Sequence, residues 1–153
     1  MTLVIVAAFL LLIATTVLHY EVLGGLNAAL PQLRIPNRAK LLVVMFAAFF
    51  VHAIEITLYG LVFYAISRWL DAGAISSGGG SLLASCMFFS AETFTALGFV
   101  DITPAGAVRL LVGVEGLNGL LLIGWSASFT YLAMERFWNA GIQSRQLPAA
   151  DLP

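Results

Sequence analysis

Long apolar runs separated by short polar segments dominate the pattern along this chain. The first run covers residues 3–18, and extending it to residue 23 gives the roughly 20 residues that a helix needs to cross a bilayer. The second covers Leu41 to Trp69, and the third runs from Pro104 to about Trp138. Because each run is long enough to span, the pattern predicts an all-α membrane protein with three transmembrane helices.

Polar and helix-breaking residues mark the boundaries between these runs. Gly24, Gly25 and the segment from Pro31 to Pro36 are expected to end the first helix and form a loop. Residues 71–81 (DAGAISSGGGS) predict a loop that faces water. We therefore expect an extra N-terminal transmembrane helix at 1–24, a cytoplasmic loop at 25–39, a domain at 40–138 that contains the outer helix, the inner helix and the segment between them, and a cytoplasmic tail at 139–153.

One segment between the second and third runs is too short and too polar to cross the bilayer. Residues 82–96 predict a short helix with Ser81 as its N-cap, and residues 97–101 predict extended backbone. Non-helical backbone at membrane depth is tolerated only where protein buries it or where it lines a watery path. A re-entrant helix followed by such a segment is how a pore places backbone carbonyls around a dehydrated ion, so the pattern favours an ion pathway.

Composition supports a membrane protein and excludes several classes of function. The chain is 61% hydrophobic and only 10% charged, with a mean hydropathy of +0.98, whereas soluble domains carry about 25% charged residues. A net charge of −1 argues against a nucleic-acid partner, which needs a basic surface. The sequence has no Ser/His/Asp set, phosphate-binding glycine loop or CxxC pair, so we do not expect an enzyme. The single cysteine, Cys86, predicts a buried structural thiol.

Basic residues predict how the chain is oriented. Three crossings place Arg34, Arg38, Lys40, Arg136 and Arg145 on one side of the membrane, and only Arg68 and Arg109 on the other. Lysine and arginine favour the cytoplasmic side. We therefore expect a multi-pass protein of the cell inner (plasma) membrane, with the N-terminus outside and the C-terminus in the cytoplasm.

The segment between the second and third runs also carries a sequence motif. Its positions are Ser90, Glu92, Thr93, Thr95, Gly98 and Asp101. In this register the segment resembles the pore loop of the potassium channel family, especially small prokaryotic members with two membrane helices around one loop. In that family a pore helix runs through Ser-x-Glu-Thr-x-Thr into the filter Thr-Val-Gly-Tyr-Gly-Asp. The likeness extends from Lys40 to about Trp138.

The resemblance implies a fold, an assembly and an ion. The fold is three transmembrane helices with a re-entrant pore helix and filter loop between the last two. One loop cannot close a ring around an ion, and the resemblance implies four copies of the chain within the lipid bilayer. The permeant ion would be a monovalent cation, K⁺ by resemblance, and no cofactor is expected. The ion-binding filter would consist of Thr95, Ala96, Leu97, Gly98, Phe99, Val100 and Asp101, with Glu92 and Thr93 as its support.

The filter departs from the family pattern. Ala96, Leu97 and Phe99 stand where the family has Thr, Val and Tyr, and Val100 replaces the second glycine. A β-branched residue resists positive φ, so the outermost carbonyl site should be distorted. Ala96 lacks the hydroxyl that threonine supplies to the innermost site. We expect a potassium-channel-like cation channel with reduced potassium preference; the alternatives are a weakly selective cation channel and a non-conducting membrane scaffold.

Carboxyl and hydroxyl groups flank the filter. In the resembling channels, the residues that match Glu92 and Asp101 share a hydrogen bond behind the filter, and two carboxyl groups held close are expected to share a proton. The alternative is Asp101 solvated at the pore mouth with Glu92 bonded to backbone amides. Thr95 either faces the filter or hydrogen-bonds the preceding helical turn.

The long helices also carry ionisable residues at membrane depth. His52 and Glu55 are three residues apart and share one helix face, and Glu55 lies about 20 Å along the helix from Arg68. An ionisable group at that depth should face protein or water, and Glu115 lies at a similar depth. We interpret His52 and Glu55 as an interhelical polar clamp; a pH-sensitive gate and a His/Glu metal site are the alternatives.

Three glycines follow one another at intervals of three residues in the last helix. They are Gly113, Gly116 and Gly119, with Glu115 and Asn118 on a neighbouring face. Small residues let helices approach closely in lipid, so packing against the short helix is the expected use. A gating hinge at Gly119 is the alternative, because glycine weakens a helix.

Overall fold

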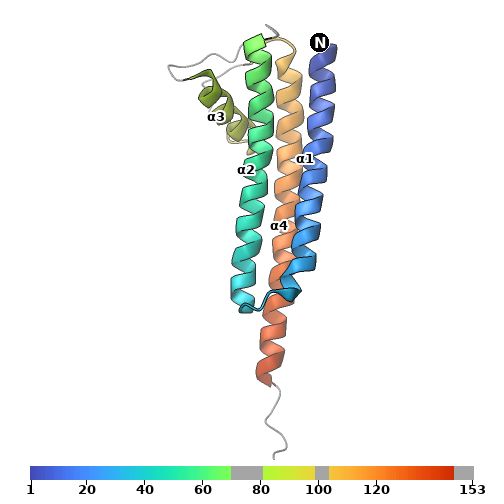
Figure 1. Cartoon of the computed structure of the whole chain (residues 1–153), viewed down its shortest axis with the longest axis vertical. Helices are drawn as coiled ribbons and strands as arrows, with labels where there is room; N and C mark the ends of the chain where they lie inside the picture. The colour runs from blue at the N-terminus through green and yellow to red at the C-terminus, as the bar shows by residue number, and fades with distance from the viewer. Residues whose placement is uncertain (70–80, 99–103, 147–153) are drawn as a thin grey trace, which may run out of the picture.

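The computed structural model describes residues 1–69, 81–98 and 104–146, and it describes side chains as far as Phe137 in the last of these ranges. Within these residues, all the regular structure is helical. The elements are α1 (Thr2–Ala29), the 3₁₀ helix η1 (Leu30–Gln32), α2 (Asn37–Trp69), α3 (Leu82–Phe94) and α4 (Val108–Gln146). The three long helices lie side by side, and α3 lies against one end of α2 (Figure 1). The result is an all-α bundle with one short additional helix.

The three long helices confirm the expected membrane spans. The segments Thr2–Gln32, Asn37–Trp69 and Val108–Phe137 are each long and apolar enough to cross a membrane. With 33 residues, α2 is about 50 Å long at 1.5 Å per residue, which exceeds the hydrocarbon thickness of about 30 Å. With 13 residues, α3 is only about 20 Å long and cannot cross.

The first helix is longer than the sequence predicts. The two glycines Gly24 and Gly25 predict an end at that point, and this prediction is wrong, because α1 continues to Ala29. Each glycine costs a helix about 1 kcal/mol relative to alanine. The added turns bury Leu30 in a cluster with α2 and α4 and keep the backbone hydrogen-bonded within the segment. The connection to α2 is therefore residues 33–36 rather than the expected loop at 25–39.

The short helix begins as predicted and ends two residues earlier. Ser81 is its N-cap, because the Ser81 Oγ accepts a hydrogen bond from the Ala84 amide at 3.3 Å. The helix ends at Phe94 rather than at Ala96, because Ala96 adopts a left-handed conformation with φ of 55°. The chain therefore leaves the helical path just before the predicted filter.

The last helix differs from the prediction at both ends. It begins at Val108 rather than at Pro104, after a turn in which Gly106 has φ of 63°. Glycine adopts this conformation without the steric cost that a Cβ imposes. The helix then continues to Gln146, so residues 139–146 are helical rather than an irregular tail.

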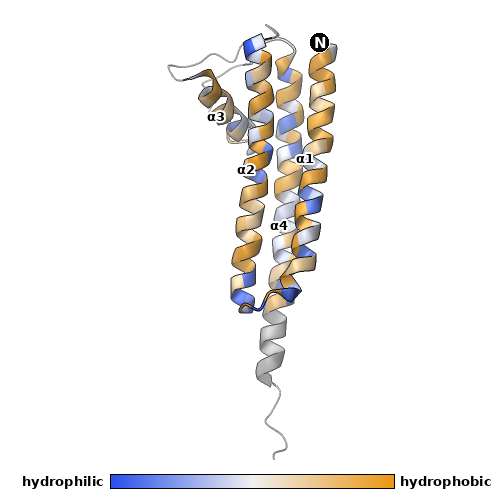
Figure 2. Cartoon of the chain, in the orientation of Figure 1, coloured by the Kyte–Doolittle hydropathy of each residue, from blue (hydrophilic) through white to orange (hydrophobic). Residues whose placement is uncertain are grey.

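The bundle is held together along one buried face of each long helix. Buried positions on α1 recur every three or four residues, which is the period of a single helix face. The other faces expose large apolar side chains, and Figure 2 shows apolar colour along most of α1 and α2. Such faces suit contact with lipid or with further copies of the chain. The buried α1 positions are Val4, Ala8, Leu11, Thr15, His19 and Leu23.

The basic residues are distributed as three crossings predict. The start of α2 and the far end of α4 lie at the same end of the bundle (Figure 1). There the Asn37 amide nitrogen donates to the Phe137 carbonyl at 3.3 Å, and the Lys40 ammonium lies 5.2 Å from the Phe137 ring centroid. Arg68 and Arg109 lie at the opposite end, with the N-terminus. One end of the bundle therefore carries most of the basic residues.

This asymmetry predicts which end faces the cytoplasm. Cysteines introduced singly at Thr2 and Ser77 should react with an impermeant thiol reagent from outside intact cells, because the more basic end is expected inside. A cysteine that replaces the exposed, uncharged Gln32 should react only after permeabilisation. Cys86→Ala supplies a cysteine-free background. Labelling of position 32 from outside would reverse the predicted orientation.

Candidate functional site

The short helix α3 is positioned by close contacts with α2. A Cβ on Gly60 would lie 2.7 Å from the Met87 sulfur and 3.3 Å from the Met87 Cα, so glycine allows this close approach without a shift of Met87. The Ser90 hydroxyl lies 2.8 Å from the Ile56 carbonyl oxygen and hydrogen-bonds it. Cys86 is fully buried at the same interface, which confirms the predicted buried thiol. Burial raises the pKa of the Cys86 thiol, which disfavours the reactive thiolate.

The C-terminal end of α3 is closed by two backbone hydrogen bonds. The Ala96 amide donates to the Thr93 carbonyl at 3.1 Å, and the Leu97 amide donates to the Glu92 carbonyl at 3.0 Å. This is a Schellman motif with Ala96 at the left-handed position that glycine usually occupies. An L-residue with a Cβ pays about 1–2 kcal/mol for that conformation. Gly98 follows with φ of 65°, so positive φ occurs at alternate residues.

The residues at this end of α3 are exposed on the single chain. Leu97 is 62% exposed, and Thr95, Ala96 and Gly98 are exposed as well. The Thr95 hydroxyl donates to the Ala91 carbonyl at 2.6 Å, so the bond to the preceding turn is the alternative that the structure shows. The rest of the predicted filter lies outside the described residues, namely Phe99, Val100 and Asp101. The predicted pairing of Glu92 with the carboxyl group of Asp101 therefore lies outside them as well.

Glycines on α4 let it support the end of α3. A Cβ on Gly119 would overlap the carbonyl group of Phe94, and one on Gly116 would lie 3.5 Å from the Thr93 carbonyl oxygen. Packing against the short helix is therefore confirmed as a use of both glycines. Gly113 is different, because an added Cβ there meets no described atom within 4 Å. A hinge at Gly119 stays an untested alternative.

A groove of about 310 Å³ opens between α3 and α4 beside the end of α3. Glu92 lies in it and is only 8% exposed, and its Oε1 is buried without a hydrogen-bond partner among the described residues. A buried carboxyl oxygen without a hydrogen-bond partner costs free energy. We therefore expect a further polar group to reach Glu92 in this groove. The lining residues are Phe89, Glu92, Thr93, Ala96, Gly98, Val112, Gly113 and Gly116.

Two sets of buried polar contacts join α4 to the other helices. The Ser90 hydroxyl on α3 hydrogen-bonds Oε1 of Glu115, which is fully buried. The Asn118 amide nitrogen donates to Oγ1 of Thr15 on α1 at 2.7 Å and to the hydroxyl of Tyr59 on α2 at 3.2 Å. Glu115 and Asn118 thus tie α4 to the other three helices. The sequence predicted Glu115 as an ionisable group at depth and placed Asn118 beside it on the face next to the glycines, without the partners of either.

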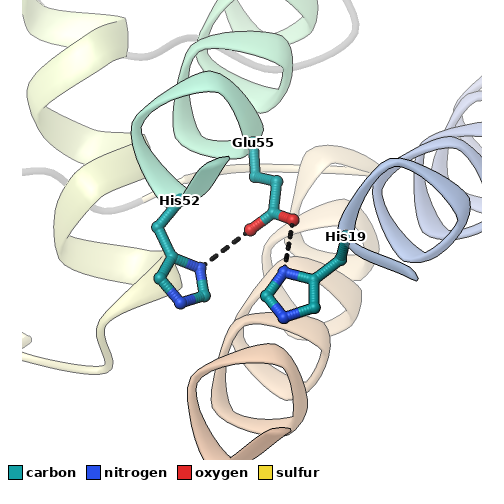
Figure 3. Close-up of side chains that lie close together, drawn as sticks. All are labelled: His19, His52 and Glu55. Carbon is teal, nitrogen blue, oxygen red and sulfur yellow. Dashed lines mark hydrogen bonds and ion pairs between the residues drawn. The ribbon is translucent and has the colours of Figure 1, made fainter. Parts of the chain in front are cut away.

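A third set of contacts surrounds Glu55. Nδ1 of His19 lies 3.0 Å from Glu55 Oε1, and Nδ1 of His52 lies 2.9 Å from Glu55 Oε2 (Figure 3). The other ring nitrogen of His19 lies 3.3 Å from the Ser126 hydroxyl on α4. His19 and Glu55 are fully buried, and the His52 side chain is 17% exposed. His52 and Glu55 are therefore in contact, as the predicted clamp requires, and the contacts extend to α1 and α4.

The contribution of α1 was missed by sequence reasoning. Thr15 and His19 are four residues apart in an otherwise apolar run, and so are Glu55 and Tyr59 on α2. Polar residues at helical spacing within a span point toward protein rather than lipid, so this spacing was a usable signal. Their partners were not predictable, because pairing depends on how each helix is rotated about its axis. Ser126 gave no comparable signal.

Comparison with known proteins decides the family. A family model described as an ion channel matches residues 39–136, well over half of the 153 residues. The chain belongs to this ion channel family. The matched domain is the potassium-type channel domain with two membrane helices. No curated protein and no solved structure matches the chain.

The family match divides the channel into two parts. The matched residues contain almost all of α2, all of α3 and the membrane-spanning part of α4. The helix α1 lies outside the match, so Thr15 and His19 are additions to the family domain. Ion channels are a class of transporter rather than a class of enzyme.

The close approach of α3 to Gly119 predicts how a substitution there changes the stability of the protein. Gly119→Ala should lower the unfolding temperature in detergent, because overpacking against backbone costs about 1–3 kcal/mol. Gly124→Ala is the matched control, since an added Cβ there meets no described atom within 4 Å and alanine favours a helix by up to ~1 kcal/mol. Thermal unfolding measured by circular dichroism compares the two. Equal destabilisation by both substitutions would contradict the α3–α4 contact.

Proposed function

We propose that four copies of this chain form a channel that passively conducts monovalent cations, with K⁺ preferred less strictly than in the potassium channels that the pore loop resembles. The ion path is lined by backbone carbonyls from residue 96 onward. The observation that carries this proposal is the geometry at the end of α3. There a helix too short to cross ends in exposed, left-handed backbone that α4 supports from behind.

The backbone at this end suits the coordination of an ion. Ala96 and Gly98 have positive φ, with Leu97 between them. Alternating backbone conformations of this kind turn successive carbonyls toward one side, which is what a row of carbonyl ion sites requires. The C-terminal end of a helix also carries partial negative charge, which favours a cation beside it. Both features support a cation rather than an anion as the permeant species.

The side chains at the same positions argue for weaker discrimination. Ala96 has no hydroxyl with which to complete the innermost site. Val100 is β-branched, and a positive φ at such a residue is costly. Selectivity depends on the number and field strength of the coordinating dipoles, so the loss of sites at both ends reduces the preference for K⁺ over Na⁺.

Exposure on the single chain supports assembly. Residues 95–98 are exposed although they lie at the predicted filter, and one chain offers only one edge to an ion. A closed ring of identical copies covers such an edge. Four is the number that the resemblance to potassium channels implies. Gly113 borders the groove, and an added Cβ there meets no atom of the described residues within 4 Å.

The groove supports a role for Glu92 behind the filter. Its buried Oε1 has no partner among the described residues. We assign that partner to the carboxyl group of Asp101, nine residues later, which would share a hydrogen bond and a proton with Glu92. The pair would brace the filter from behind, as the matching residues do in the resembling channels.

Assembly is the first consequence to measure. Native mass measurement in mild detergent should give four copies per particle, because one exposed edge per chain needs a ring to close it. Cross-linking in the membrane before extraction serves as the control for dissociation in detergent. A monomer or dimer as the largest species under both conditions would contradict a central pore.

Ion selectivity is the second consequence. In planar bilayers the native channel should show a reversal potential under K⁺/Na⁺ exchange that corresponds to weak potassium preference. The double variant Ala96→Thr with Val100→Gly should shift it toward strong preference, because it restores one hydroxyl and one residue that tolerates positive φ. Ala14→Thr with Val17→Gly makes the same chemical changes on exposed positions of α1 and should leave the reversal potential unchanged.

Two outcomes would contradict the proposal. Strong potassium selectivity of the native chain, unchanged by the double variant, would mean that the backbone reaches the ion by a different geometry. The absence of current from correctly assembled tetramers, in the native chain and in the double variant, would favour the non-conducting scaffold.

A further inference from the structure

The cluster of His19, His52 and Glu55 has the donors of a metal site. One ligand atom from each of the three residues lies within 4.8 Å of the other two. Each imidazole presents its Nδ1 to a different oxygen of the same carboxylate, at 3.0 and 2.9 Å (Figure 3). Two nitrogens from two helices and one carboxylate therefore converge on a single small volume.

Charge at this cluster is unbalanced when both imidazoles are neutral. Glu55 is fully buried, and among the described residues the two histidines are its only ion-pair partners. Neutral imidazoles donate hydrogen bonds but leave the negative charge of a carboxylate in place. Buried charges in proteins are paired or coordinate metals. A divalent cation would supply the missing charge at the point where the donors meet.

We propose that His19, His52 and Glu55 bind a divalent transition-metal ion, with Zn²⁺ the best match to the ligand set. Two histidines and one glutamate are a set that zinc accepts in tetrahedral sites, with the fourth position open to water. Neighbouring ligands of a tetrahedral ion with bonds of about 2.0 Å are about 3.3 Å apart. The N···O separations of 3.0 and 2.9 Å are close to this spacing. All three ligand atoms lie within 4.8 Å of one another, so the ion would draw the two imidazoles together to reach this spacing.

The surroundings of His19 fit ligation through Nδ1. A metal there requires a ring that keeps its proton on Nε2, and the structure supplies an acceptor for that proton, the Ser126 hydroxyl at 3.3 Å. In metal sites a partner of this kind fixes the tautomer and the ring orientation of the ligand. The site thus has an outer partner on α4 as well as ligands on α1 and α2.

The partly exposed His52 provides a route for the ion. A groove of about 570 Å³ lies between α2 and α4, and both His52 and Ser126 line it. The groove reaches the site on the side where the imidazole of His52 is 17% exposed. The three helices of the single chain therefore leave one side of the site open to this groove.

Metal binding would connect the additional helix to the channel domain. His19 belongs to α1, outside the family match, whereas His52 and Glu55 belong to the matched domain. The bound ion would hold α1 against α2 and, through Ser126, against α4. In this arrangement metal occupancy would strengthen the attachment of α1, which Thr15 and the apolar face of the helix already hold.

The test uses full-length protein without a polyhistidine tag, because the chain itself has only two histidines. After chelator treatment, the protein in detergent is titrated with Co²⁺ as a spectroscopic probe and then with Zn²⁺ as a competitor. We expect one Co²⁺ per chain, with the visible absorption of tetrahedral cobalt, and its displacement by Zn²⁺. Zn²⁺ should also raise the unfolding temperature, and a chelator should reverse the shift.

Four variants test the assignment of the ligands. His19→Ala and His52→Ala should each abolish the cobalt spectrum. Ser126→Ala should weaken Co²⁺ binding about 10- to 100-fold, which is the usual effect of losing an outer partner. Glu115→Gln removes another buried carboxyl group and should bind Co²⁺ like the native chain. Circular dichroism shows whether each variant is folded.

Either of two results would overturn the site. One is the absence of stoichiometric Co²⁺ uptake by the folded native chain, which would leave a hydrogen-bonded clamp. The other is uptake that survives in a folded His19→Ala variant. Because metal binding is read without ionic current, this outcome is distinguishable from a failure of the proposed conduction.

Discussion

Lipid is as apolar as a leucine side chain, so apolar helix faces gain little by leaving lipid for one another, and buried polar contacts acquire unusual weight. In this chain such contacts fix both the height and the rotation of each long helix. Each of the three helices presents a pair of polar side chains to the same interior levels, and a shift by one residue would move them toward lipid. The pairs are Thr15 and His19 on α1, Glu55 and Tyr59 on α2, and Asn118 and Ser126 on α4.

The position of the short helix α3 depends on this frame. The short helix α3 cannot anchor itself in the bilayer, because its 13 residues do not span it. It is held by the Ser90 hydroxyl, which reaches both α2 and Glu115 on α4, and by the contact of its last carbonyl group with Gly119. The left-handed backbone that follows is therefore presented at a defined place beside α4, which is what a carbonyl-lined ion path requires.

The additional helix is part of the channel structure rather than an appendage. It lies outside the residues that match the ion channel family, yet two of its side chains complete polar sets whose other members lie inside the match. A stripe of small and apolar residues alone would allow α1 to slide or rotate in lipid. Thr15 and His19 remove that freedom, because misplacing either would leave buried partners unsatisfied.

By itself the sequence determined the three long apolar helices, the short helix α3 and the cap of α3 at Ser81, because apolar length and capping chemistry are local properties. The spacing of its residues also indicated the family to which the chain belongs, through the likeness that extends from Lys40 to about Trp138. Tertiary structure decided where α1 ends, since the burial of Leu30 against other helices outweighs the cost of two glycines. It also decided the partners of Glu55, because an interhelical pair depends on the rotation of both helices, which no local pattern specifies.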